Sequence, residues 1–225
     1  NFASLGIEPL TVGAGVFGPV QVFTKWPREG AQRYSEISRR SLQIQYTLGA
    51  GYELPWLGVR LGATLMLISQ IFESELALNL ASITIDPEDP DLDAVALVRA
   101  SDHLIPVPTF AVSARPASLL TLAVVYRLFY DVDASGTAEV VLGRQLSRQT
   151  SNGEPFALVE GDKVRGLLSM PAVMRVAGVY RDPDERFEVE FAFVWEGWGR
   201  NKEILFKPRG IRVLVPGLNM EQVLE

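Results

Sequence analysis

Apolar and polar side chains alternate with a period of two along most of this chain, which is typical of β-strands that present two different faces. Between Ser41 and Leu54 every even position is apolar or aromatic, whereas every odd position is polar, charged or glycine. Stronger or weaker alternation recurs in six further segments: 10–17, 59–72, 106–115, 120–133, 168–181 and 187–195. The pattern therefore predicts an all-β chain of seven strands, with an eighth candidate at 211–215 and a helical or loop-like tail from Met220.

The length of these segments separates two kinds of all-β protein. Ordinary strands average about five or six residues, but the alternation from Ser41 to Leu54 continues without a break for 14 residues. A tilted strand needs about 9 to 11 residues to cross a bilayer. The long segments therefore favour a transmembrane up-and-down antiparallel β-barrel over a soluble sandwich.

The connections between the segments alternate strictly between short and long. Short breaks fall at 55–58, 116–118 and 182–186, and long loops are expected at about 19–40, 73–105 and 134–167. An outer-membrane barrel has short turns at one rim and long loops at the other. We therefore expect residues 1–225 to form one barrel segment without a separate domain.

Aromatic residues flank both kinds of connection. Some lie beside the short turns (Tyr52, Trp56, Tyr180 and Phe187), and others lie towards the long loops (Tyr126, Phe129, Tyr130, Trp195 and Trp198). Two such groups match the aromatic girdles at the two interfaces of a membrane barrel. The alternative is that these rings fill the core of a soluble sandwich.

Composition excludes several classes of protein. The chain has 225 residues and is 48% hydrophobic, but its longest apolar stretches, such as 61–68 and 119–126, are far shorter than the roughly 18 residues of a spanning helix. A pI of about 5.0 argues against nucleic-acid binding, and the absence of cysteine excludes disulfides and thiolate metal sites. No basic and apolar leader follows Asn1, so any export signal is expected upstream or already removed.

Two motifs, in order along the chain, carry a resemblance to a known family. The first is TVGAGVFGP at Thr11–Pro19, followed by GAQRYS at 30–35 and the strand from Ser41. The second is LSMP at 168–171, followed by FVWEGW at 193–198. Together they resemble the FadL/TodX family of outer-membrane transporters for long-chain fatty acids and other hydrophobic compounds, over roughly residues 10–206.

The resemblance implies a fold and a function. Members of the family are fourteen-stranded barrels with an amino-terminal hatch, so this chain would be about half of such a barrel, either an internal portion or a shortened relative. It would act in the bacterial outer membrane, as a monomer without cofactor or enzymatic activity, by passive uptake of hydrophobic molecules with lumenal binding and lateral release. The residues matching the strand that opens laterally are Gly13, Gly15, Phe17, Gly18 and Pro19. The simpler interpretation of these residues is a strand end that enters a proline turn.

If the apolar faces meet lipid, the opposite faces line a lumen. Arg127 and Arg175 are then candidates to bind a substrate carboxylate through charge-assisted hydrogen bonds. The candidates to line its acyl tail are Val125, Phe129, Met66, Ile68 and Phe72. The alternative for an arginine is structural, with Arg175 and Glu196 bracing the wall as an ion pair.

Other chemistry finds little support in the sequence. The acidic stretch 86–93 fails the calcium-loop template because Ala94 and Ala100 stand where glycine and glutamate are needed. His103, the one histidine, lies beside Ser101 and Asp102, whose side chains point apart on an extended chain, which argues against a hydrolase. The expected partners are a hydrophobic small molecule and outer-membrane lipid or lipopolysaccharide, not nucleic acid or metal. Two other functions stay open: a soluble all-β binding or adhesion module, and a porin for polar solutes.

Overall fold

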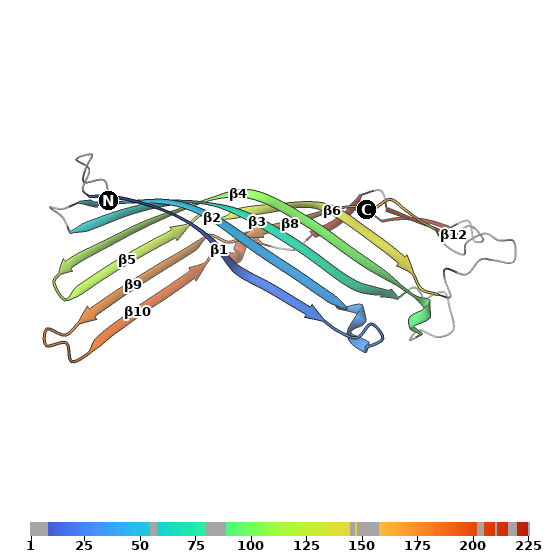
Figure 1. The fold of residues 1–225 in the computed structure, drawn as a ribbon, viewed down its shortest axis with the longest axis horizontal. Coiled ribbons are helices and arrows are strands. Elements are labelled where there is room, and N and C mark those ends of the chain that lie inside the picture. Colours follow the sequence, from blue (N-terminus) through green and yellow to red (C-terminus); the bar gives the residue numbers. More distant parts are fainter. Residues whose placement is uncertain are drawn as a thin grey trace.

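The computed structural model describes residues 9–54, 58–79, 89–144, 147, 158–201, 205–209, 211–215 and 220–224, and almost all of them lie in antiparallel strands. Figure 1 shows the long strands side by side in one sheet. The strands are β1 (Leu10–Lys25), β2 (Ser38–Leu54), β3 (Val59–Asn79), β4 (Asp93–Ala117), β5 (Leu120–Arg127), β6 (Tyr130–Leu142), β7 (Leu158–Glu160), β8 (Lys163–Met170), β9 (Val173–Arg181), β10 (Glu188–Glu196), β11 (Leu205–Arg209), β12 (Ile211–Val215) and β13 (Met220–Leu224). Three short 3-10 turns accompany them: η2 (Ala31–Tyr34), η4 (Pro90–Leu92) and η5 (Trp198–Arg200). The prediction of an all-β antiparallel chain is confirmed.

The register joins several of the shorter strands into long ones. β4 pairs with β5 through Thr109 and Arg127, and with β6 in the same register through Ser101 and Ser135. β8 and β9 pair with β6 and β5 in the same way, and β10 and β11 pair with β9 and β8. The sheet is therefore a meander of seven long strands, three of which are interrupted.

The carboxyl-terminal part differs from the sequence prediction. The segment 211–215 was expected to be the eighth strand, but as β12 it pairs with β7 and prolongs the seventh strand. The eighth strand begins instead with β13, which pairs with β12 where a helical or loop-like tail was expected. A five-residue strand of mixed polar and apolar residues carries too few positions for its alternation to be recognised.

The expected long loops are also shorter in the structure, because the strands run past their predicted ends. β1 continues to Lys25 and β2 begins at Ser38, and both β3 and β4 extend into the segment 73–105. β6 and β8 likewise extend into 134–167 from either end. Backbone hydrogen bonds hold these extensions together. Where both faces of a strand carry polar residues, the sequence shows no alternation, so the extension cannot be recognised from the hydrophobic pattern.

One face of the sheet is concave. The amide of Gln43 on β2 donates a hydrogen bond to the hydroxyl of Tyr130 on β6, at 3.3 Å. Three strand spacings separate β2 from β6, so their backbones would lie about 14 Å apart on a flat sheet. The bond indicates that the sheet curves towards these two side chains, and we call this side the inner face.

Along several strands, the residues that face inwards have odd numbers near the short turns and even numbers nearer the long loops. In the segment 120–133 the sequence predicts one uninterrupted alternation, with Tyr130 and Val132 on the lipid side and Asp131 and Asp133 on the lumen side. The structure contradicts this beyond the break at 128–129, because Tyr130 and Val132 are buried on the inner face and both aspartates are exposed on the outer one. β1, β4 and the β8–β9 junction show comparable irregularities at 18–19, 103–104 and 171–172.

A compact apolar cluster packs on the inner face at the level of these irregularities. Its buried members are Ile68, Ala100, Ile105, Val107, Tyr130, Val132 and Ala134, with Met66, Leu168 and Met170 packed against them. Leu104 adopts a φ of 58° beside this cluster, in the left-handed region that non-glycine residues rarely visit. That turn allows Ile105 and Ala100 to face the same side of β4 although they are five residues apart.

The outer face is apolar over the half of the sheet nearest the short turns. One row of paired positions across the sheet is wholly apolar or aromatic: Leu10, Tyr52, Leu61, Val112, Val124, Val176 and Phe193. On β2 the outward apolar positions run from Leu42 to Leu54, which corresponds to a band of about 28 Å if the strand tilts by about 45°. Within the described residues, no helix has the length and hydrophobicity to cross a membrane.

Candidate ligand-binding site

Two arginines share a cavity on the inner face. Arg127 on β5 and Arg175 on β9 line a space of about 350 Å³, together with Thr109, Gln45 and Met66. The pairing of Arg127 with Val173 and of Val125 with Arg175 places the two arginines on adjacent strands, diagonally across the ladder. The remaining lining residues are Pro19, Val125 and Val173.

Several polar groups of this cavity lack an ion-pair or hydrogen-bond partner among the described residues. Neither arginine forms an ion pair with the described residues. The Nε of Arg127 and the Oγ1 of Thr109 are buried without a hydrogen bond, a situation that costs about 1–3 kcal/mol per group. An anion with several acceptor oxygens, such as a carboxylate, would satisfy the arginine and accept from the threonine hydroxyl.

A second cavity of about 360 Å³ lies beside the first on the same face. Its lining is mostly apolar and includes Phe72, Leu168 and Met170, with Arg39 and Gln70 among its polar members. Hydrogen bonds from Gln45 to Gln43, at 3.1 Å, and from Gln43 to Tyr130 join the edges of the two cavities. A cationic compartment and an apolar compartment therefore adjoin each other, which is the arrangement that an amphipathic ligand needs.

Comparison with known proteins places the fold. No family model matches the chain, and no curated protein does. A solved structure described as a Pseudomonas aeruginosa FadL homologue aligns with a TM-score of 0.75 at 13% sequence identity, over 92% of this chain and 52% of that one. The chain has a FadL-like β-barrel fold. It spans about half the length of the structure that it matches.

In the FadL-like sheet, six of the seven residues predicted to bind substrate fall in three places on the inner face. Arg127, Arg175, Val125 and Met66 line the arginine cavity, and Phe72 lines the apolar cavity. Ile68 faces the same side but is fully buried in the apolar cluster.

Phe129 differs from the prediction. It lies in the break between β5 and β6, is 41% exposed, and lines neither cavity. Its ring instead lies under the guanidinium of Arg200, at 3.8 Å. The break ends the alternation from which its inward orientation was inferred.

Sequence reasoning missed four polar residues of the site: Gln43, Gln45, Thr109 and Tyr130. The first three stand on polar positions of alternating strands, but nothing in the sequence distinguishes them from other polar positions. Tyr130 was assigned to the wrong face. The proposed bracing pair of Arg175 with Glu196 is not formed, and Glu196 accepts a hydrogen bond from Trp198 Nε1 at 2.7 Å.

The glycine-rich part of β1 contains one interruption. Gly13 and Gly15 are paired regularly with β2, and so is Phe17, which stands opposite Gln45. The next pair is Val20 with Gln43, so Gly18 and Pro19 form a bulge with one residue more than the facing strand. Because Pro19 also lines the arginine cavity, this bulge is the part of the predicted opening that adjoins the site.

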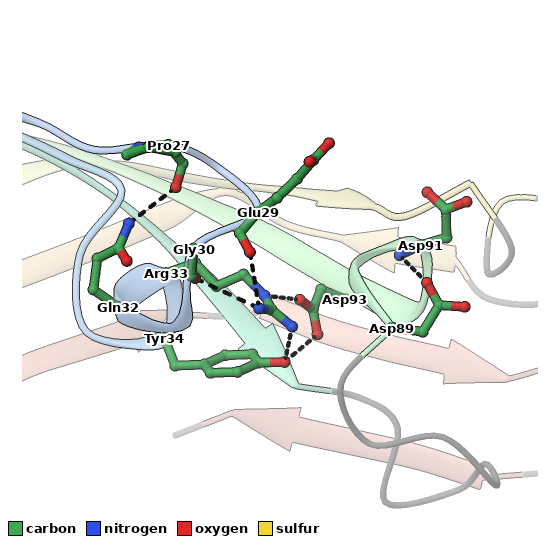
Figure 2. Close-up of polar contacts among 9 residues, drawn as sticks. All are labelled: Pro27, Glu29, Gly30, Gln32, Arg33, Tyr34, Asp89, Asp91 and Asp93. Atoms are coloured by element: carbon green, nitrogen blue, oxygen red, sulfur yellow. Dashed lines mark hydrogen bonds and ion pairs between the residues drawn. The ribbon is translucent and has the colours of Figure 1, made fainter.

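The GAQRYS motif has a structural role at the other end of the sheet, shown in Figure 2. Arg33 of η2 donates from Nε to Asp93 at 2.6 Å, and the hydroxyl of Tyr34 donates to the same carboxylate at 3.1 Å. Arg33 and Asp93 are only 5% and 3% exposed. Burial, together with the acceptor Asp93, raises the pKa of the Tyr34 phenol, so it remains a neutral donor. This cluster holds the first loop against the start of β4.

The remaining sequence candidates bring no further chemistry together. His103 is exposed on β4, and the described residues contain no group of three side chains suited to a metal ion. Of the acidic stretch, 86–88 lie outside the described residues. Asp89 accepts from the backbone N–H of Asp91, and Asp93 belongs to the Arg33 cluster.

Proposed function

We propose that this chain forms part of an outer-membrane barrel that takes up hydrophobic amphipathic molecules, such as long-chain fatty acids, by passive diffusion. The observation that carries the proposal is the inner-face pair of cavities, one with Arg127, Arg175 and a buried unpaired Thr109 hydroxyl, the other apolar. A carboxylate would bind in the first, and its acyl chain would lie against Phe72 and Met170 in the second. The similarity of fold to a FadL homologue supports the same function.

The character of the inner face argues for a hydrophobic cargo. A porin for polar solutes has a water-filled, polar interior. Here the second cavity on the inner face is lined mostly by apolar side chains, among them Phe72, Leu168 and Met170. Apolar surface along the path lowers the free energy of an acyl chain relative to water, by about 0.8 kcal/mol for each methylene group.

A charge on the outer face tests the proposed membrane location. Leu48 is 58% exposed in the middle of the apolar band, and we expect Leu48→Arg to destabilise the barrel by about 2–4 kcal/mol, since its side chain would face lipid. The fraction of folded, protease-resistant protein in the membrane measures the effect. The matched control is Gln21→Arg, which adds the same charge on the outer face at the edge of the band, opposite Leu42, where the cost falls to about 0–1 kcal/mol. A soluble domain would tolerate both substitutions within about 0.5 kcal/mol, and equal tolerance of the two would contradict the membrane location.

Deletion of Pro19 tests lateral release at the β1 bulge. The bulge holds one residue more than β2 opposite it, so the deletion restores a continuous ladder and leaves Phe17 and Val20 on their present faces. We expect uptake of fatty acid by cells to fall by about tenfold or more, because a continuous backbone ladder has no gap through which a ligand leaves.

Binding supplies the control for that deletion. The arginines remain in place, so the affinity of the purified protein for the same fatty acid should change less than about threefold, a difference of under 1 kcal/mol. Unchanged uptake in the variant with the deletion would show that release follows another route.

A further inference from the structure

A patch of cations lies on the outer face beyond the apolar band. Arg99 on β4, Lys163 on β8 and Arg209 on β11 stand in one row of the ladder, with Thr137 of β6 between the first two. Arg165 and Lys207 are paired in the next row on that face. These five residues, which we call the outer basic patch, extend over three strand spacings, or about 14 Å.

Most of the cations of this patch form no ion pair with the described residues, although Glu73 stands opposite Arg99 in the ladder. Arg165 pairs with Asp133, whereas no ion pair to Arg99, Lys163, Lys207 or Arg209 is found in the part of the chain that the structure describes. These four residues are all exposed. The patch therefore presents an excess of positive charge, although the chain as a whole carries a net charge of −6.

A cavity lined by both polar and apolar side chains adjoins the patch on the side of the apolar band. It measures about 490 Å³ and lies where the last long strand is interrupted between β10 and β11. Its polar lining residues, which offer both donors and acceptors, are Asp131, Asp133, Ser169, Arg200 and Asn201. The change of face at 128–129 turns the two aspartates outwards, and the aromatic residues Phe129, Trp195 and Trp198 are exposed near the same level of the chain.

We propose that the outer basic patch and this cavity bind the phosphorylated sugar headgroup of a glycolipid in the surrounding membrane leaflet. The phosphates would pair with Lys163, Lys207 and their cationic neighbours, and sugar hydroxyls would bond with the carboxylate of Asp131 and the amide of Asn201. The acyl chains would lie along the apolar outer face directly below. This inference rests on the proposed membrane location but not on the arginine cavity, which is on the opposite face.

The dimensions and chemistry favour a glycolipid over a phospholipid with one phosphate. One phosphate group is satisfied by one or two cations, whereas this patch spreads five over about 14 Å. The adjoining cavity offers hydrogen-bonding groups of both kinds. A headgroup with two phosphates separated by sugar hydroxyls uses both features.

The test compares lipids and variants of the purified full chain in detergent micelles. The probes are bisphosphorylated lipid A, the same lipid with both phosphates removed, and phosphatidylglycerol. Wild-type protein should bind bisphosphorylated lipid A at least about tenfold more tightly than either of the other two. The double variant Lys163→Ala/Lys207→Ala should lose that preference by about tenfold or more, since each cation at an anionic surface contributes measurably. Equal affinity of the wild type for the three lipids, or an unchanged preference in the variant, would overturn the proposal.

Two controls separate this inference from the proposed transport function. Arg115→Ala removes an exposed cation near the short turns, and it should leave the lipid preference unchanged; loss of the preference there would show a non-specific charge effect and overturn the site. Binding of palmitate by the same preparations reports on the inner face. If the wild type binds no palmitate but prefers bisphosphorylated lipid A, the transport function fails and the lipid site stands.

Discussion

Replacing both Arg127 and Arg175 with alanine is expected to weaken the binding of palmitate by about a hundredfold or more. Each charge-assisted hydrogen bond contributes about 1.5–3 kcal/mol, and the two guanidinium groups line one cavity without an acidic partner among the described residues. Quenching of tryptophan fluorescence or calorimetry on the purified protein measures the affinity. Each single variant should lose part of the affinity for palmitate. Arg175→Ala is the more informative single variant because its side chain is exposed, so its removal leaves no buried void.

An uncharged ligand of the same length shows whether the arginines recognise the carboxylate. Hexadecanol should bind wild-type and doubly substituted protein with affinities within about fivefold of each other, because its hydroxyl gains little from a guanidinium. Arg60→Ala provides a matched control, since Arg60 pairs with Glu53 at 3.2 Å and lines neither cavity. An equal loss of affinity for palmitate and for hexadecanol would mean that the substitutions disturb the structure of the sheet and that the arginines do not bind the carboxylate.

Asp93→Ala is expected to be the most damaging single substitution for stability, at about 3–5 kcal/mol. Arg33 and Asp93 are both almost completely buried and bond at 2.6 Å, so removing the carboxylate takes the charged acceptor away from the Nε of a buried guanidinium. Tyr34 loses an acceptor at the same time. Thermal unfolding measures the global effect, and faster amide exchange over residues 30–37 would locate it.

A double variant separates the ion pair from simple packing. Arg33→Met/Asp93→Leu removes both charges and keeps apolar volume, so it should recover most of the stability lost in Asp93→Ala, as buried ion pairs exchanged for apolar groups commonly do. Arg60→Ala is a matched surface control, because both side chains of the Arg60–Glu53 pair are exposed, at 59% and 47%, and such pairs contribute about 0–1 kcal/mol. If Asp93→Ala cost no more than Arg60→Ala, the cluster would not anchor the loop.

The hydrophobic pattern predicted the strands of the apolar band well, for a simple physical reason. Between Ser41 and Leu54 one face of the strand is apolar and the other is polar, so the type of each residue indicates the face on which it lies. The structure places Tyr46, Leu48 and Tyr52 together on the outer face, as that alternation requires. The same argument correctly placed Arg127, Arg175, Val125 and Met66 on one face, where they line one cavity.

Outside the apolar band the hydrophobic pattern no longer predicts where the strands lie. β2 begins with Ser38, Arg39 and Arg40, and β3 runs through Glu73 and Glu75, so both faces are polar and the strands were predicted as loops. Backbone hydrogen bonds continue regardless of side-chain polarity. The outer basic patch escaped notice for the same reason, since its cations stand on three strands, β4, β8 and β11, and only the register brings them into two rows.

The sequence by itself determined the strand type, the alternation of faces within the apolar band and the candidate arginines, because period-two burial is a local property of the chain. Only the tertiary structure decided where that alternation changes face. The breaks at 18–19, 103–104, 128–129 and 171–172 bring Gln43 to Tyr130, bury Ile68 and turn Asp131 outwards. A single inserted residue reverses every side chain beyond it, and its position depends on the curvature and pairing of neighbouring strands, which no local window of sequence contains.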